Sequence, residues 1–375
     1  MNEIPFNRPF VTGEETDLMA DAMARGHLSG DGHYTRRASS LLAEITGVED
    51  VLLTTSCTHA LEMAALLLEL EPGDEVIMPS FTFVSTANAV ALRGAKPVFV
   101  DIRPDTHNID ETLIEQSTTS RTKAIVVVHY AGIACEMDEI LTIAAKHNLA
   151  VIEDNAHGLG ATYRDRQLGS MGTLATLSFH ETKNVHCGEG GALLVCDARY
   201  MERAEIIREK GTNRSRFFRG QVDKYSWVDI GSSYLPSELL AAFLTAQLEN
   251  FDLIQKDRMN VWTTYATALR SWSDEYGFRL PNPPAHTKHP AHLFWLLAPD
   301  FECRQRFIAH LATDGIKAVF HYVPLHNSVM GSLSGSVDLP ITDFVSDRLV
   351  RLPLFAGLRA DELERILDSV LRFRP

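Results

Sequence analysis

Residues 51–80 read VLLTTSCTHALEMAALLLELEPGDEVIMPS: a short apolar run, a helical period and a second short apolar run. The first run, with its flanking residues, predicts a strand over 48–56. Apolar residues at helical spacing, with few breakers, predict a helix over 58–70. A proline–glycine–aspartate turn then leads into a second strand over 75–80. This stretch is therefore expected to form a strand–helix–strand unit.

The same rhythm continues to residue 154. We expect strands over 95–102, 123–130 and 149–154, and helices over 84–94 and 137–148. The run KAIVVVHY is nearly all apolar, as expected for a strand that is buried on both faces. This alternation predicts an α/β fold with a mostly parallel sheet and helices on both faces.

Beyond residue 160 the pattern changes. Strands are expected over 173–180, 190–197, 292–299 and 318–324, and helices over 200–211, 304–315 and 360–373. A long helical stretch over 238–272 is expected to be broken or bent. The strands and helices that follow it suffice for a small α+β domain. We predict a large domain of residues 1–250 and a small C-terminal domain of residues 251–375.

Composition excludes several classes of protein. With 45% hydrophobic and 22% charged residues, the chain has the balance of a globular protein and not of a disordered one. It has no apolar run long enough for a transmembrane helix, and its start lacks the features of a signal peptide. A formal net charge of −14 argues against general binding to nucleic acid or membrane surfaces. Five cysteines without C-x-x-C spacing disfavour a disulfide framework, so the expected compartment is the cytoplasm.

Two charged residues stand at, or just after, the ends of predicted strands. Asp154 ends the strand VIED, at the edge where open α/β sheets bind ligands, although an aspartate there can also cap a helix. Lys183 lies in LSFHETKN and is either a solvated loop lysine or one that forms a Schiff base with a cofactor aldehyde. A cofactor of that kind also needs a carboxylate on its ring nitrogen, and Asp154 can supply it.

A third candidate site lies in TSCTHAL, where a strand gives way to a helix. Hydroxyl groups and free backbone N–H groups at a helix N-terminus form an anion site. The alternative is simple capping of the helix by serine or threonine.

Together these segments carry a resemblance to a known family. The motifs TSCTHAL, PSFTFVSTANA, VFVDI, NID, VVHYAG, VIEDNAH, LSFHETKN, GEGG and VPLH occur in the same order as in DegT-type sugar aminotransferases. Those enzymes use pyridoxal 5′-phosphate, which becomes pyridoxamine phosphate during the cycle, to aminate keto sugars carried on nucleotides. The resemblance covers nearly the whole chain and implies a fold-type-I aminotransferase. GDGHYTRR, REKGTNRS, FFRGQVDKYSW and DIGSSYL are similar to the branch that makes dTDP-4-amino-4,6-dideoxyhexoses.

The resemblance implies a role for each matching residue. Lys183 binds the cofactor covalently and later moves protons to and from the sugar carbon. Asp154 keeps the ring nitrogen protonated, and His157 contacts the ring or its 3′ oxygen. Phe83 stacks on the ring face, or is an ordinary core residue. The phosphate is expected to be held by Ser56, Cys57, Thr58 and Ser178.

Some positions depart from the family pattern. Many members have glycine at the position of Cys57, and the cysteine side chain narrows the approach of the backbone to the phosphate. Ser233 stands where many members have an asparagine that reaches the phosphate from the neighbouring subunit. The close branch tends to have glutamine in place of His157, and a histidine can titrate there. Some relatives have histidine in place of Lys183 and catalyse deoxygenation, so the lysine favours transamination.

The substrate pocket is less sharply indicated. Arg219 lies in a locally basic segment between aromatic residues, and we expect it to bind the nucleotide diphosphate; the alternative is a solvated loop. His321 and His326, in FHYVPLH, are candidates for the sugar pocket or are ordinary polar residues at a strand end.

Three histidines with regular spacing raise the question of a metal. His286, His289 and His292 are of a type that suits zinc or copper. Prolines make this segment irregular, and no nearby cysteine or aspartate completes a ligand set. No metal site is expected.

The resemblance therefore implies a pyridoxal-phosphate aminotransferase. It also implies that the substrates are a dTDP-4-keto-6-deoxyhexose and L-glutamate, and that the product, of gluco or galacto configuration, serves biosynthesis of deoxyaminosugars for an antibiotic or a polysaccharide. We expect a homodimer with shared active sites. The alternatives are amination at C3 of a dTDP-3-keto-6-deoxyhexose, or a non-catalytic regulator that binds sugar nucleotides.

Overall fold

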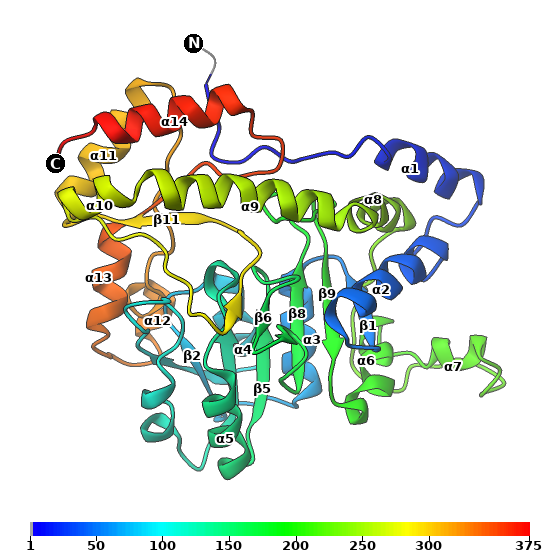
Figure 1. Ribbon diagram of the computed structural model, residues 1–375. Helices are drawn as coiled ribbons and strands as arrows, with labels where there is room; N and C mark the ends of the chain where they lie inside the picture. Colours follow the sequence, from blue (N-terminus) through cyan, green and yellow to red (C-terminus); the bar gives the residue numbers. More distant parts are fainter. Residues whose placement is uncertain (1–2) are drawn as a thin grey trace.

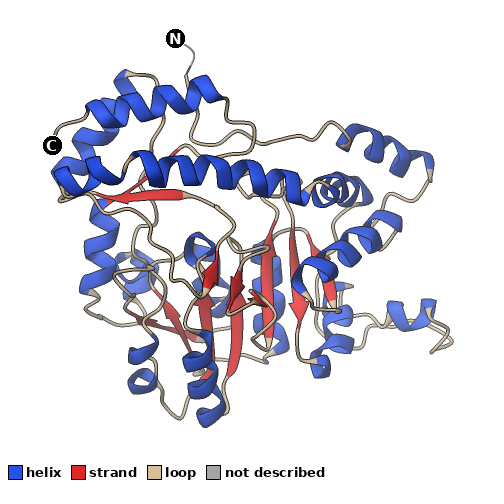
Figure 2. Cartoon of the chain, viewed as in Figure 1, coloured by secondary structure: helices blue, strands red, loops and turns tan. Residues whose placement is uncertain are grey.

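The centre of the molecule is a seven-stranded sheet surrounded by helices (Figure 1, Figure 2). A computed structural model describes residues 3–375. In spatial order the strands are β1 (Val51–Thr54), β9 (Gly191–Val195), β8 (Leu174–Ser178), β5 (Ala150–Asp154), β4 (Thr122–Val128), β2 (Glu75–Pro79) and β3 (Lys96–Val100). β9 is antiparallel to both its neighbours, and the pairs from β8 to β3 are parallel. The predicted α/β fold with a mostly parallel sheet is confirmed.

Helices cover both faces of the sheet because successive strand residues face opposite sides. Ala124 and Val126 of β4 join one core, together with α3, α4 and α6. Ile125 and Val127 face the other side, where α5 packs. Helices α2 and α8 cover the β1–β9–β8 part of the sheet. The helices up to residue 249 are α1 (Glu15–Ala24), α2 (His33–Thr46), α3 (Cys57–Leu67), α4 (Val84–Ala91), α5 (Met137–His147), α6 (Met201–Arg208), α7 (Arg214–Phe218) and α8 (Glu238–Glu249).

Helices α1 and α2 lie before the region in which the strand–helix rhythm is clear. The carboxylate of Glu238, which begins α8, accepts hydrogen bonds from the backbone N–H groups of Gly32, Tyr34 and Thr35 at the start of α2. A buried acid from a distant helix therefore stabilises the free N–H groups of α2.

The long helical stretch is broken, as predicted. It consists of α8, α9 (Phe251–Ala268) and α10 (Arg270–Tyr276), with the first break at Asn250. The remaining elements are β11 (Phe294–Leu297), α11 (Phe301–Thr313), α12 (Val329–Ser332), α13 (Pro340–Arg348), β12 (Leu349–Leu352) and α14 (Ala360–Arg372). β11 and β12 form an antiparallel pair, and a small sheet joins β10 (Thr287–Lys288), β6 (Thr162–Tyr163) and β7 (Arg166–Gln167).

A separate core joins α9, α11, α14 and the β11–β12 pair. Ile4 from the other end of the chain belongs to this core and bridges to Ile316. The division into domains of residues 1–250 and 251–375 stays a prediction. Within residues 3–375, no helix is long and apolar enough to cross a membrane.

The strand predicted over 318–324 is wrong. Only Val319 forms a bridge there, to Arg351. The rings of His321 and Tyr322 stack with centroids 3.8 Å apart, whereas consecutive side chains of a strand point to opposite faces. The segment is an irregular loop, and its His321 and Tyr322 rings line one cavity.

Candidate active site

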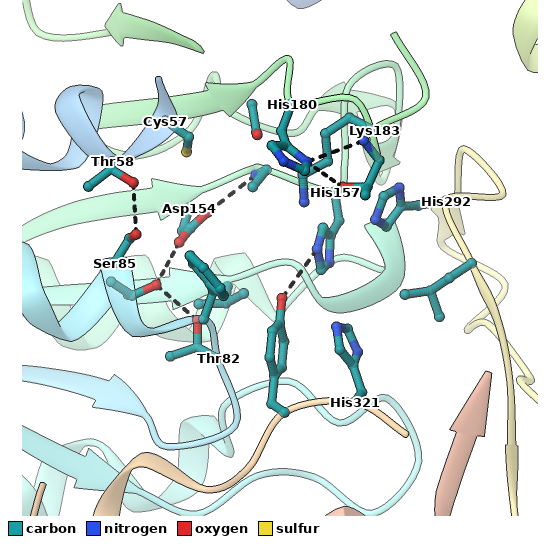
Figure 3. Close-up of a pocket in the computed structure, with 18 of the residues that line it drawn as sticks. Cys57, Thr58, Thr82, Ser85, Asp154, His157, His180, Lys183, His292 and His321 are labelled. Atoms are coloured by element: carbon teal, nitrogen blue, oxygen red, sulfur yellow. Dashed lines mark hydrogen bonds between the residues drawn. The ribbon is translucent and has the colours of Figure 1, made fainter. Parts of the chain in front are cut away.

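A cavity of about 450 Å³ opens at the carboxyl ends of β4, β5 and β8. Its walls include the first residues of α3 and α4, the loop between β8 and β9, and residues of the C-terminal part of the chain. Figure 3 shows Cys57, Thr58 and Ser85 on one side of this space and His292 and His321 on the other. This position is where open α/β sheets bind ligands.

Asp154 lies buried at the end of β5. Its Oδ2 accepts a hydrogen bond from the hydroxyl of Thr86 at 2.8 Å, and its Oδ1 accepts one from the backbone N–H of Ala156 at 3.3 Å. Burial raises the pKa of this carboxyl group, and hydrogen bonding opposes the rise. The carboxylate forms no ion pair with the described residues 3–375, so it suits a cationic group that enters the cavity.

Lys183 follows β8 in the loop that leads to β9, and its side chain lines the same cavity. Burial lowers the pKa of its amine to about 8. The negative charge of Asp154 opposes this shift, and the positive charge of Arg351 adds to it. With this pKa about a tenth of the amine is neutral at pH 7, and this neutral form can attack a carbonyl carbon.

The N-terminus of α3 forms a polar cup. The hydroxyl of Ser56 accepts a hydrogen bond from the N–H of His59, and Thr58 bonds to Ser85 at 2.8 Å. The Cys57 thiol lies 3.6 Å from Thr176 Oγ1, and burial raises its pKa to about 12, so it stays protonated. Hydroxyl groups beside the positive end of a helix bind a phosphate.

Close packing of backbone holds this cup in place. A Cβ atom at Gly191, the first residue of β9, would lie 2.4 Å from the backbone nitrogen of Cys57. Only glycine at this position therefore allows β9 to pass so close to the start of α3, which explains the last glycine of the GEGG motif.

His157 is the centre of a wall of aromatic rings. Its ring stacks on His292 with centroids 4.2 Å apart, and its Nε2 lies 3.3 Å from the hydroxyl of Tyr322. The backbone N–H of Ala131 donates to its Nδ1 at 3.4 Å. Burial is the largest cause lowering the pKa of His157, so the ring is neutral and its proton lies on Nε2.

His292 has its tautomer fixed by its neighbours. The amide nitrogen of Asn184 donates to Gln255 and to the carbonyl of Pro290, so its oxygen accepts from Nδ1 of His292 at 2.9 Å. Burial keeps the pKa of His292 well below its ordinary value. Its Nε2 is therefore an acceptor at the cavity wall.

The cavity gathers most of the predicted site residues. They are Ser56, Cys57, Thr58, Phe83, Asp154, His157, Ser178, Lys183 and His321. Phe83 caps α4 and is 58% exposed, so it is not an ordinary core residue.

Three predicted residues lie elsewhere. Ser233 forms a bridge with Glu209 on an exposed loop. Arg219 directly follows α7 and pairs with Glu205 at 2.7 Å. His326 is buried, with Nδ1 2.8 Å from the hydroxyl of Ser80. Their roles in binding cofactor and substrate stay predictions.

The sequence analysis did not assign Thr86, Tyr322, His292 and Arg351 to this site, although they also line the cavity. Thr86 lies inside the motif PSFTFVSTANA, and Tyr322 is next to His321. His292 does not form a cluster with His286 and His289, because each has a different neighbour: Glu136 for His286, Trp262 for His289 and Asn184 for His292. Arg351 lies in RLPLF, where nothing local marks it as a cavity residue.

Comparisons with known proteins agree with this site. The family model described as the DegT/DnrJ/EryC1/StrS aminotransferase family matches residues 10–371. The chain belongs to this family. The uncharacterized protein MJ1066 of Methanocaldococcus jannaschii is 32% identical, over 98% of this chain and 96% of that protein.

Solved structures share the fold of this aminotransferase. The aminotransferase TlmJ from Streptoalloteichus hindustanus is 28% identical with a TM-score of 0.91, over 99% of this chain and 98% of that one. PseC of Helicobacter pylori, an aminotransferase involved in the biosynthesis of pseudoaminic acid, is 26% identical with a TM-score of 0.91, over 99% of both chains. The protein is therefore a sugar aminotransferase that depends on pyridoxal phosphate.

The cavity suits that cofactor. The carboxylate of Asp154 is buried and has no ion pair within residues 3–375, so it fits a protonated ring nitrogen, and the cup at α3 fits a phosphate group. The amine of Lys183 fits an aldehyde. When bound, the cofactor supplies an electron sink for bonds broken at the carbon that carries the amino group.

Proposed function

We propose that this aminotransferase transfers the amino group of L-glutamate to C4 of a dTDP-4-keto-6-deoxyhexose. The observation that carries the proposal is the placement of Lys183 and Asp154 in one buried cavity. The choice of sugar is supported by the branch motifs, among them FFRGQVDKYSW and DIGSSYL.

Each residue has a part in this proposal. Lys183 would hold the cofactor through its amine; once the amine of glutamate displaces it, the freed Nζ would take the proton from the α-carbon of glutamate and later deliver one to C4 of the sugar. Asp154 holds the cofactor ring by its nitrogen, while Ser56, Thr58 and Ser178 orient its phosphate. Phe83 lies at the cavity edge, where it can cover the ring and exclude water. His157 donates a hydrogen bond from Nε2 toward the ring oxygen or toward Tyr322.

The first experiment is an absorption spectrum of the purified protein before and after L-glutamate is added without sugar. We expect a yellow band that glutamate converts into the band of the amine form of the cofactor. Adding the keto sugar should restore the yellow band, and NMR of the product should place nitrogen at C4. Nitrogen at C3 would support the C3 alternative. No cofactor band after adding pyridoxal phosphate would reject the proposal and favour the sugar-binding regulator.

We also propose that the protein acts as a homodimer in which a second copy completes the site. Helix α7 projects from the body of the molecule (Figure 1), and the segment around it exposes Phe218 by 69% and Trp227 by 79%. Large apolar surfaces of this kind mark interaction sites. Ser233 lies just beyond this segment, and Arg219 lies within it, so a partner could bring both to a cavity.

The mass of the protein in solution tests the homodimer. Light scattering should give twice the chain mass of 41.7 kDa. Trp227→Asp should reduce that mass toward a single chain, because a charge at a buried interface position is costly. Leu253→Asp is the matched control, since Leu253 is also exposed but lies on α9. A monomeric and active wild-type protein would contradict the shared site.

A further inference from the structure

Asn184 ties the lysine loop, residues 179–190 between β8 and β9, to the C-terminal part of the chain. Its amide nitrogen donates to Oε1 of Gln255 at 2.9 Å and to the carbonyl oxygen of Pro290 at 2.7 Å. Its oxygen accepts a hydrogen bond from Nδ1 of His292 at 2.9 Å. Both donors of this buried amide are therefore used, and all three bonds reach residues beyond position 250.

The segment of residues 290–292 that receives two of these bonds is itself firmly held. Arg258 of α9 is buried, and its guanidinium group donates to the carbonyl oxygens of Ala291 and His292. Hydrogen bonds from a charged donor are roughly twice as strong as neutral ones. Ala291 has a φ of 50°, a left-handed conformation that persists in a non-glycine residue only where its surroundings enforce it. Asn184 is therefore anchored to a fixed support.

Lys183 depends on such a support because it lies on a loop. A reacting side chain must be held within about 0.5 Å of its productive position, and sites on loops are less precise than sites on helices or strands. The N–H of Lys183 donates to the carbonyl oxygen of His180 at 2.9 Å, which closes only a local turn. Asn184 connects the loop to His292, which lines the same cavity as Lys183 (Figure 3).

These amide bonds hold the loop without adding a charge beside the amine. A carboxylate in place of the amide would favour the protonated amine and raise its pKa. The charges that act on Lys183 are those of Asp154, on β5, and Arg351, on β12. In the lysine loop, His180 and Glu189 lie 3.7 Å apart at the edge of the cavity. Burial opposes the charged forms of the remaining titratable groups of the cavity wall: Cys57, His157, His292, His321 and Tyr322.

We propose that Asn184 is a positioning residue, which fixes the lysine loop to the segment 290–292 so that the amine of Lys183 stays shielded from water and aimed into the cavity. This inference rests on the proposed function, in which Lys183 is the reacting amine. Asn184 does not line the cavity, so it acts through the lysine and not on the substrate. A loop released from this support would admit water, and hydration stabilises the charged form of an amine.

The test measures the pKa of Lys183 in the cofactor-free protein. Competitive acetylation with acetic anhydride, followed by mass spectrometry of the peptide that contains Lys183, gives the reactivity of the amine at each pH. The wild-type midpoint is expected near 8. In Asn184→Ala we expect a midpoint of about 9 or higher, closer to the ordinary value of 10.5.

The first half of the reaction gives a second measurement. In Asn184→Ala the maximal rate with L-glutamate should fall by about 10- to 100-fold, because a small misplacement of a reacting group is costly. The half-saturating concentration of L-glutamate should change little. Absorbance of the bound cofactor counts the loaded sites, so the rate is expressed per loaded site and a loss of folded protein does not imitate the effect.

Two further variants separate positioning from general stability. Thr342→Val is the matched control, because it removes a different buried hydrogen bond between distant parts of the chain, from Thr342 on α13 to Asp101. It should leave the midpoint of Lys183 near 8 even if the protein unfolds more easily. Gln255→Leu removes one of the three partners of Asn184 and should give a smaller rise; it serves if Asn184→Ala does not fold.

The outcomes are distinct. A midpoint that stays near 8 in Asn184→Ala, or in Gln255→Leu if only that variant folds, would overturn the inference. An equal rise in Thr342→Val would also overturn it, because general loosening would then explain the effect. If the wild-type protein accepts no amino acid, the proposed function fails, and acetylation of the cofactor-free protein still decides whether Asn184 positions the lysine.

Discussion

Lys183→Ala is expected to abolish turnover, with a loss of at least about 10⁴-fold, because one side chain both binds the cofactor covalently and transfers protons. The yellow band of the covalently held cofactor should disappear with it. Turnover of L-glutamate and keto sugar, measured by release of 2-oxoglutarate, gives the rate. Lys146→Ala is the matched control, because Lys146 is an exposed lysine that pairs only with Glu115. Near-normal turnover by the Lys183 variant would reject the mechanism.

The same lysine sets the pH dependence of cofactor capture. Burial lowers its pKa to about 8 from an ordinary value of 10.5, so the protonated amine dominates below pH 8. Only the neutral amine attacks an aldehyde, so the rate of capture by the cofactor-free protein should rise about tenfold per pH unit below 8 and level off above it. The profile is measured by stopped-flow absorbance. A rise that continues toward pH 10 would show that the lysine is not desolvated.

Local sequence patterns predict most elements but not their pairing. The apolar run KAIVVVHY needs no context, because a strand buried on both faces is apolar throughout. The antiparallel direction of β9 depends on its two neighbours and has no local signal. Helix α2 likewise depends on Glu238, which is distant in sequence, for the partners of its first N–H groups. The segment 318–324 has the composition of a strand, but its His321 and Tyr322 rings stack on each other and line the cavity.

The residues of the site also divide into those that local sequence indicates and those that only the folded chain brings together. Lys183, Asp154 and the α3 cup stand in motifs next to strand ends, so their types and positions indicate chemistry. His292 and Arg351 reach the cavity from the C-terminal part of the chain, and only the folded arrangement brings them to Lys183. The spacing of His286, His289 and His292 suggests a common site, whereas side-chain packing separates them.

Asp154→Asn is expected to lower turnover by about 100- to 1,000-fold, the usual effect of removing a fixed charge that stabilises a transition state in a buried site. The substitution preserves shape and can keep the hydrogen bond from Thr86. It removes only the charge that would hold a proton on the ring nitrogen of the cofactor. Single-turnover absorbance with L-glutamate measures the loss in the first half of the reaction. An unaffected rate would mean that another carboxylate has this role.

Without cofactor, Asp154→Asn should be at least as stable to unfolding as the cofactor-free wild type. Burial raises the pKa of Asp154 in the folded protein above its unfolded value, so the folded state binds the proton more tightly. Stability from this group is then present at low pH and is lost as the pH rises through the folded pKa, and asparagine removes that loss.

Glu153→Gln is the contrasting variant. Glu153 is buried and precedes Asp154 in the chain. Its carboxylate accepts hydrogen bonds from His129 and from the backbone N–H groups of Gly169, Met171 and Gly172, and its pKa is lowered. Its loss should cost about 3 kcal/mol in the free energy of unfolding. Thermal unfolding at neutral pH should therefore distinguish these adjacent carboxylates. Glu153 stabilises the fold, whereas the charge of Asp154 lowers the stability of the fold and is kept because the reaction needs it.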